Sequence, residues 1–196
     1  MTVSCRRIGE PTAFYQGTLQ DGLALDPLTG YSRTFVRFFT AHPCARMTLL
    51  TKSDEADHLL DLDHRGHPIL SWTLNPPEVC DAFEPDTPTA DQRIAAMHRC
   101  MAAGYPLRAV VMPTIPIPER PTIYQRFLDA LFESVPLQRI TRGSICIYRT
   151  ALTLMERKIG PSNPVSNALR ADQDSSADGH LRFAFDERIG CVHKVL

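Results

Sequence analysis

Short apolar runs alternate with longer segments of helical period through the middle of this sequence. Parallel strands need long crossover connections, which are usually helices, so this alternation points to βαβ units built on a parallel sheet. With 196 residues, the chain has the length of one ordinary domain. We therefore expect an α/β fold with about five parallel strands, forming an incomplete barrel or an open doubly wound sheet.

The hydrophobic pattern gives the expected elements in chain order. Strands are expected over 12–18, 46–51, 68–74, 108–112 and 139–148. Helices are expected near 32–41, from Ser53 to an exit at Gly66, between Thr89 and Gly104, and from Pro121 onward. Thr89 with Gln92 is a capping-box pattern, so the third of these helices is the best defined. Its apolar face is expected to carry Ile94, Met97 and Met101.

Other stretches are expected to be irregular. The Asn-Pro-Pro run at 75–77 predicts a turn, followed by a long loop through Pro85 and Pro88. The pattern weakens after Ala151, the polar stretch 171–179 predicts a flexible loop, and 185–193 predicts a short terminal helix. We expect a barrel core over 1–150 and a C-terminal extension over 151–196 that packs on or beside it.

Charge and apolar content exclude several classes of protein. The formal net charge is -1, so no global field attracts the chain to nucleic acid or an anionic membrane. No signal-peptide h-region and no run of roughly 20 apolar residues occur, which predicts a cytoplasmic protein without membrane contact. The six cysteines stand far apart, which favours buried or idle thiols in a reducing compartment.

Common catalytic signatures are absent, including the phosphate-binding loop, the dinucleotide fingerprint and the zinc-protease and hydrolase motifs. Histidine and aspartate gather between Asp57 and His67, which raises the hypothesis of a metal site or of a cluster-independent lyase or hydrolase. On a helix, however, Asp57 and Asp61 share one face while His64 falls at the exit. A solvated charged surface is therefore favoured, and no metal site is predicted.

Polar residues recur at the expected carboxyl ends of the strands, where ligands gather in parallel α/β folds. They are Thr18, Asp21, Thr51, Lys52, Thr73, Asn75, Thr114 and Ser144, together with Met112. Ordinary strand-end turns are the alternative explanation, but recurrence after successive strands favours a site.

Several ordered segments carry a family resemblance. They are 17–26 (GTLQDGLALD), 49–53 (LLTKS), 71–76 (SWTLNP), 83–88 (FEPDTP), 103–108 (AGYPLR) and 113–118 (PTIPIP). With them, the stretch from about Gly17 to Arg188 resembles the spore photoproduct lyase-like branch of the radical S-adenosylmethionine (SAM) enzymes.

The resemblance implies a partial (β/α) barrel in which three cysteines of a C-x-x-x-C-x-x-C motif hold a [4Fe-4S] cluster. SAM binds the open iron, and reduction yields a 5′-deoxyadenosyl radical. Cysteine thiolates are the normal ligands of such a cluster, and this chain has no such triplet, so we do not expect it to hold the cluster alone. The match begins at what resembles the family's second strand, so the first strand unit is expected to be missing and an edge uncovered.

The same resemblance assigns SAM-binding roles to strand-end residues. It implies that Lys52 meets the SAM carboxylate, that Thr73 and Asn75 hydrogen-bond the cofactor, and that the Met112 backbone contacts adenine. Asp21 belongs to the same set. Thr18 departs from the pattern, because related sequences often have a glutamate there that holds the SAM amino group, and threonine supplies no charge. No catalytic residue is assigned.

The leading hypothesis is a truncated or divergent radical SAM protein of a DNA-repair lyase lineage that is not competent for catalysis alone. The alternative is a non-catalytic ligand-binding or interaction module that pairs with a cluster-bearing chain. The expected partner is such a chain or a missing N-terminal segment, and DNA is implied only by the resemblance.

Overall fold

The computed structural model describes residues 12–17, 20–42, 44–115, 117, 119–171, 173–175 and 180–183. The chain forms two compact units. The first comprises Met1–Val110 and Leu128–Ile140, and the second comprises Val111–Phe127 and Thr141–Leu196. The division into a core over 1–150 and an extension over 151–196 stays a prediction.

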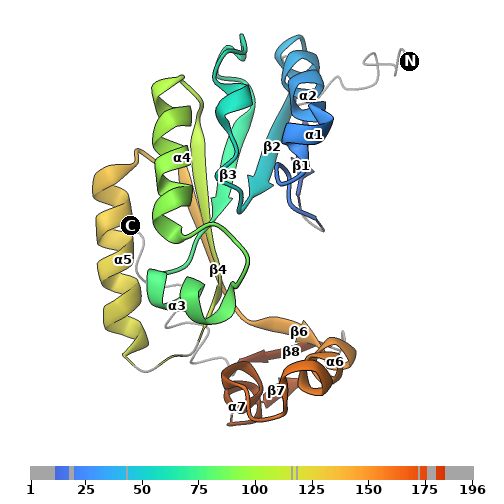
Figure 1. Cartoon of the computed structure of the whole chain (residues 1–196), viewed down its shortest axis with the longest axis vertical. Helices are drawn as coiled ribbons and strands as arrows, with labels where there is room; N and C mark the ends of the chain where they lie inside the picture. Colours follow the sequence, from blue (N-terminus) through green and yellow to red (C-terminus); the bar gives the residue numbers. More distant parts are fainter. Residues whose placement is uncertain are drawn as a thin grey trace. The chain divides into compact units, whose positions relative to one another are not determined.

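A five-stranded sheet has the order β1-β2-β3-β4-β5, so that neighbours in the sheet are also neighbours in sequence (Figure 1). Its strands are β1 Thr12–Gln16, β2 Ala45–Thr51, β3 Ile69–Thr73, β4 Leu107–Thr114 and β5 Arg139–Ser144. The registers of the first four strands are parallel, as in the pairs Thr51 with Trp72 and Thr73 with Val110. The expected α/β fold with five parallel strands, of the partial-barrel type, is confirmed.

The central and the edge strand differ in burial. All five residues of β3 are buried, as expected for a parallel strand covered on both faces, and the Trp72 indole N–H donates to the Ser53 carbonyl at 2.9 Å. In β1, four of five residues are exposed. Within the described residues β1 has β2 as its single neighbour in the sheet.

Helices connect the strands in the described part of the chain. They are α1 Asp26–Thr29, α2 Tyr31–Thr40, α3 Pro77–Phe83, α4 Ala90–Ala102, α5 Arg120–Ser134, α6 Arg149–Ile159 and α7 Pro164–Ala171, with a 3₁₀ turn η2 at Asp57–Leu59. Within the first unit, α2 packs on β2 and α4 on η2. In the part of the chain that is described, no helix combines the length and apolarity needed to cross a membrane.

The junction of α1 and α2 depends on a buried carboxylate. Gly30 adopts φ 60° and serves both as the end of α1 and as the residue before α2. Asp26 is 1% exposed, and its oxygens accept hydrogen bonds from the Ser32 backbone N–H and hydroxyl and contact the His58 ring. The first turn of α2 is thus capped by a side chain from α1.

The capping box at the start of α4 is confirmed. Thr89 Oγ1 accepts from the Gln92 backbone, and the Gln92 side chain accepts from the Thr89 backbone. The predicted apolar face is rotated in the structure, because Ile94 and Met101 are half-buried. The buried residues of α4 are Ala90, Arg93, Ala96, Met97 and Cys100.

The helix expected after Ser53 is wrong, because only the short turn η2 forms there. The Ser53 hydroxyl accepts from the Glu55 backbone in a local turn rather than capping a helix. The Arg99 side chain of α4 donates a hydrogen bond to the Asp54 carbonyl. Tertiary contacts therefore satisfy this backbone, and Leu59 is buried without a helical repeat.

The expectation of a long loop after 75–77 is also wrong for the first half of that segment. Pro77 is the first residue of α3, a position where the missing backbone N–H costs nothing. The proline pair therefore starts a helix instead of only ending a strand.

The expected strand 139–148 is two strands in two sheets. β5 ends at Ser144, and β6 Cys146–Tyr148 pairs antiparallel with β8 His180–Phe183, which also pairs with β7 Gln173–Ser175. β7 lies inside the stretch 171–179 that was expected to be a loop. Helices α6 and α7 occupy the weakly patterned region after Ala151. The terminal helix expected over 185–193 lies outside the described residues.

Candidate functional site

Asp21 joins the loop after β1 to the end of β2. Its Oδ1 accepts hydrogen bonds from the Leu23 and Ala24 backbone N–H groups and from the Thr51 hydroxyl, at 2.8, 2.9 and 2.7 Å. Its Oδ2 accepts from the Lys52 backbone N–H at 2.6 Å. The carboxylate thus holds the ends of two neighbouring strands together, as expected where parallel strands end at one edge.

Two glycines allow this loop to approach β2. A Cβ on Gly17 would lie 2.1 Å from the Leu50 carbonyl oxygen, and one on Gly22 would lie 2.5 Å from the same atom. Gly17 also has φ +98°, a conformation that side-chain-bearing residues rarely adopt. The Gly22 N–H donates to that carbonyl at 2.9 Å. Glycine is therefore required at both positions by contact with the strand end.

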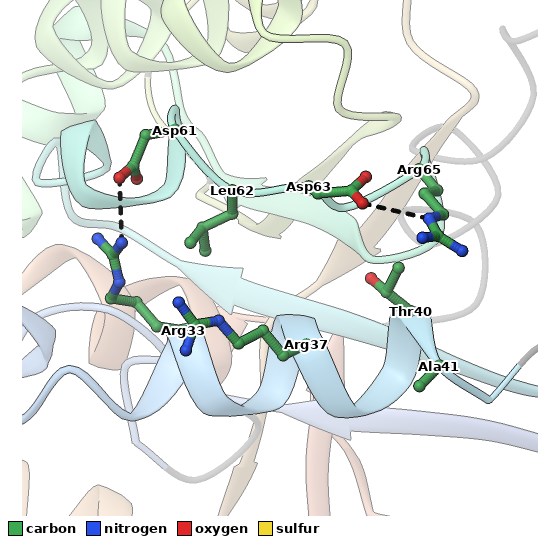
Figure 2. Close-up of a pocket in the computed structure, with 8 residues that line it drawn as sticks. All are labelled: Arg33, Arg37, Thr40, Ala41, Asp61, Leu62, Asp63 and Arg65. Atoms are coloured by element: carbon green, nitrogen blue, oxygen red, sulfur yellow. Dashed lines mark hydrogen bonds and ion pairs between the residues drawn. The ribbon is translucent and has the colours of Figure 1, made fainter.

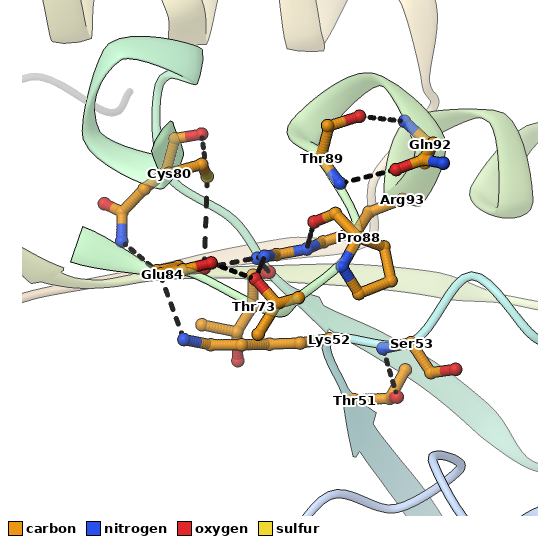
Figure 3. A network of polar contacts seen from close by, with 12 residues as sticks. Thr51, Lys52, Ser53, Thr73, Cys80, Glu84, Pro88, Thr89, Gln92 and Arg93 are labelled. Carbon is orange, nitrogen blue, oxygen red and sulfur yellow. Dashed lines mark hydrogen bonds and ion pairs between the residues drawn. The ribbon is translucent and has the colours of Figure 1, made fainter. Parts of the chain in front are cut away.

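Lys52, at the end of β2, meets a buried carboxylate (Figure 3). Its Nζ lies 3.0 Å from Glu84 Oε1, and the side chains of Lys52 and Glu84 are 35% and 7% exposed. The Asn75 side-chain amide donates to the same oxygen at 3.2 Å. Burial raises the pKa of Glu84, but hydrogen bonds from Lys52 and Arg93 outweigh it and leave the pKa below its usual value. Glu84 is therefore ionised at neutral pH.

Arg93 contacts this carboxylate and is fully buried. Its Nη2 contacts Glu84 Oε2 at 2.7 Å, and its Nη1 donates to the Thr73 carbonyl at 3.0 Å. Nη2 also donates to Thr87 Oγ1, and Nε donates to the Pro88 carbonyl, at 2.7 and 2.8 Å. A charged residue buried this deeply requires such complete pairing.

The structure brings four of the expected site residues into one continuous network. Asp21 contacts the Lys52 backbone, Lys52 and Asn75 share Glu84, and the Thr73 carbonyl accepts from Arg93. Thr73 and Asn75 are themselves 9% and 1% exposed. The roles of these residues toward a cofactor stay predictions.

Two expected residues remain. Thr18 lies outside the described residues. Met112 lies in the part of β4 that belongs to the second unit, and it is 47% exposed. Its sulfur atom lies 2.6 Å from the position that a Cβ on Gly143 would occupy.

Glu84 and Arg93 were not identified from the sequence. Glu84 falls in a stretch expected to be a loop, where nothing marks a carboxylate as buried. Arg93 did leave a signal, because it occupies the same helical face as Ala90, Met97 and Cys100. A charged residue within a buried helical face implies a buried partner.

The histidine and aspartate group between Asp57 and His67 makes separate local contacts. The His64 ring stacks on Tyr105 at 3.6 Å between centroids and is 7% exposed, so the expectation of a solvated surface is wrong for this residue. The expectation is correct for Asp57, Asp61 and Asp63, which are 71%, 66% and 73% exposed.

Two of these aspartates border an open groove of about 450 Å³ between α2 and the loop after η2 (Figure 2). There Arg33 pairs with Asp61 at 3.0 Å and Arg65 with Asp63 at 3.3 Å. The hydrogen bond from Arg33 lowers the pKa of Asp61. Exposed pairs of this kind contribute little to stability.

Cysteine side chains do not gather among the described residues. Cys80 and Cys100 are buried, and Cys44 and Cys146 are exposed. Across the described part of the chain, no three His, Cys, Asp or Glu side chains form a group able to hold a metal. The described thiols therefore do not fit a [4Fe-4S] cluster, which needs several thiolates around one cube.

The model of the family described as spore photoproduct lyase matches residues 4–172. The chain belongs to the spore photoproduct lyase family. Spore photoproduct lyases of Geobacillus sp. (strain Y412MC61) and Bacillus subtilis (strain 168) are 34% and 33% identical to it over 107 residues. The family suggested by the strand-end motifs is confirmed.

Solved spore photoproduct lyases share the fold over 93% of this chain at 25% identity. One complexed with dinucleoside spore photoproduct superimposes with a TM-score of 0.80, and a variant with bound AdoMet and the same dinucleoside does so with 0.81. The match covers 31% of the length of each of the two curated relatives and about 56% of the solved chains.

Proposed function

We propose that this chain is the part of a spore photoproduct lyase-like radical SAM protein that holds AdoMet but not the iron-sulfur cluster. The observation that carries the proposal is the polar network at the strand ends of a chain whose family match extends over 4–172. The sequence has no C-x-x-x-C-x-x-C motif, so the cluster must be held by cysteines outside these 196 residues. On its own, the chain is not competent for the lyase reaction.

The network has the chemistry to hold the amino-acid end of AdoMet. Lys52 supplies a partly exposed ammonium group for the cofactor carboxylate, and a charge-assisted hydrogen bond of this kind is among the stronger polar contacts. We assign Thr73 and Asn75 as hydrogen-bonding residues and the Met112 backbone as the adenine contact. Asp21 fixes the strand end from which Lys52 projects. Bound AdoMet would supply radical chemistry to an assembled enzyme.

DNA carrying a photoproduct is the proposed substrate class of that assembled enzyme. The support is that a related solved enzyme is complexed with dinucleoside spore photoproduct. The net charge of -1 means that DNA contact must come from local groups or from the cluster-bearing part.

Calorimetric titration with AdoMet tests the binding proposal. The wild-type chain should release or take up heat with saturation at or below millimolar AdoMet. Lys52→Met should weaken binding by roughly tenfold or more, because a hydrogen bond to a charged group contributes about 1.5–3 kcal/mol. Lys158→Met is the matched control, since Lys158 is an exposed lysine on α6. Absence of heat at millimolar AdoMet would refute a retained AdoMet site.

A second candidate function is a non-catalytic module that pairs with a cluster-bearing chain. The edge strand β1 favours it, because Tyr15 and Phe14 are 56% and 38% exposed on a strand with free pairing potential in the described sheet. Sedimentation of the chain with a separately expressed chain of the family that carries a C-x-x-x-C-x-x-C motif tests this function. A complex that Tyr15→Lys disrupts would support it, and no complex at micromolar concentrations would refute it.

A further inference from the structure

Glu84 has no acceptor position left for a ligand. A carboxylate has about four lone-pair sites. Oε1 accepts from Lys52 and Asn75, and Oε2 contacts the Arg93 guanidinium and, at 3.9 Å, the Cys80 thiol. Glu84 therefore acts on any ligand through its neighbours rather than by contact.

Arg93 fixes the position of Glu84. Its guanidinium is anchored to the Thr73 and Pro88 carbonyls and the Thr87 hydroxyl, so it is tied to the end of β3 and to the loop before α4. A fully buried guanidinium with these partners cannot follow Glu84 if the carboxylate moves. The carboxylate is thus held by an anchored guanidinium.

Of the Lys52, Glu84 and Arg93 side chains, that of Lys52 is the one that can reach a ligand. Its ammonium has three N–H donors, and Glu84 is its ion-pair partner within the described residues. The Asp21 carboxylate accepts a hydrogen bond from the Lys52 backbone N–H. Together with Glu84 it balances the charges of Lys52 and Arg93, so the remaining N–H donors of the ammonium, rather than a net charge, favour an anionic ligand. The side chain of Lys52 is 35% exposed, whereas Arg93 is fully buried.

We propose that Glu84, held by Arg93, is a positioning residue that fixes the Lys52 ammonium for the carboxylate of an amino-acid-bearing ligand. The inference rests on the proposed AdoMet-binding function, and it adds Glu84 and Arg93 to the machinery of that site. Lys52 is pre-ordered by its pair with Glu84, so less side-chain entropy is lost when a carboxylate binds.

The rate of lysine acylation by N-hydroxysuccinimidyl acetate tests this inference in the folded chain. Lysine occurs only at positions 52, 158 and 194, so peptide mass spectrometry resolves each rate. Glu84→Asp keeps the charge but withdraws the carboxylate by one methylene. We expect Lys52 to react up to roughly fivefold faster in this variant, the range of a partly exposed ion pair, with Lys158 unchanged. AdoMet should protect Lys52 in the wild type and less well in Glu84→Asp.

Each outcome separates this inference from the proposed function. An unchanged Lys52 rate in folded Glu84→Asp, with AdoMet still protecting the wild type, overturns the positioning role alone. AdoMet protection in neither protein overturns both the AdoMet site and this inference. If Glu84→Asp does not fold, the wild type supplies the test. Lys52 should then react more slowly than Lys158 in the native chain and equally in urea, and equal native rates overturn the inference.

Discussion

The Oδ2 atom of Asp21 accepts a hydrogen bond from the backbone N–H of Lys52 at 2.6 Å. This contact joins the loop after β1 to the strand end that carries the proposed ligand-binding lysine. Because Oδ1 of the same carboxylate takes two further backbone N–H groups and the Thr51 hydroxyl, Asp21 determines the local backbone more than it offers charge to a ligand.

Asp21→Asn should destabilise the chain by about 1–3 kcal/mol, because an amide cannot accept on both of its polar atoms and its NH₂ would face a backbone donor. Urea unfolding measures this loss. Asp63→Asn is the control, since Asp63 is 73% exposed and should change stability by less than about 0.5 kcal/mol. Equal effects of the two substitutions would contradict the bridging role of Asp21.

Gly17→Ala should destabilise the chain more than Gly160→Ala. Both glycines have positive φ, +98° and +89°, so both substitutions introduce backbone strain of order 1 kcal/mol. Only Gly17 has an atom in the way, the Leu50 carbonyl oxygen at 2.1 Å, whereas nothing lies within 4 Å of a Cβ on Gly160. Thermal unfolding of the two variants separates strain from contact, and similar melting temperatures would show that the close approach to β2 is unimportant.

Arg93→Met should cost about 3–5 kcal/mol, because it leaves the Glu84 carboxylate buried with fewer partners. Arg65→Met, at a pair whose side chains are both 73% exposed, should have little effect. Guanidinium unfolding of both variants provides the measurement. An unchanged free energy of unfolding in Arg93→Met would mean that the buried network does not stabilise the site.

The thiols should differ in reactivity. Burial raises the pKa of Cys100 to about 12, and burial with the nearby Glu84 carboxylate raises the pKa of Cys80. Because the thiolate is the reacting form, and a raised pKa keeps the thiol protonated at pH 8, iodoacetamide should modify Cys44 and Cys146 well before Cys80 and Cys100. Peptide mass spectrometry of the native chain follows the order, and fast labelling of Cys100 would contradict its burial.

The strand ends were predictable from the sequence because the short apolar runs of β2, β3 and β4 are strong local signals. Once the strands are parallel, their carboxyl ends share one edge, so Asp21, Lys52 and Asn75 come near one another without knowledge of the fold's details.

Elements fixed by distant contacts were not predictable in this way. The segment after Ser53 has helical leucines but satisfies its backbone through Arg99 of α4, 45 residues away from Asp54. The Glu84–Arg93 pair spans a shorter stretch of sequence, but it depends on how α3 packs on α4. The start of α7 has a local signal that was missed, because Asn163 caps the Ser166 N–H just before Pro164 opens the helix.

Anaerobic reconstitution with iron and sulfide, followed by addition of a reductant and AdoMet, tests the central claim most directly. The 196-residue chain should develop no stoichiometric [4Fe-4S] absorption band and should not cleave AdoMet, because its sequence lacks the three-cysteine motif. A stoichiometric cluster signal accompanied by AdoMet cleavage in the isolated chain would contradict this account.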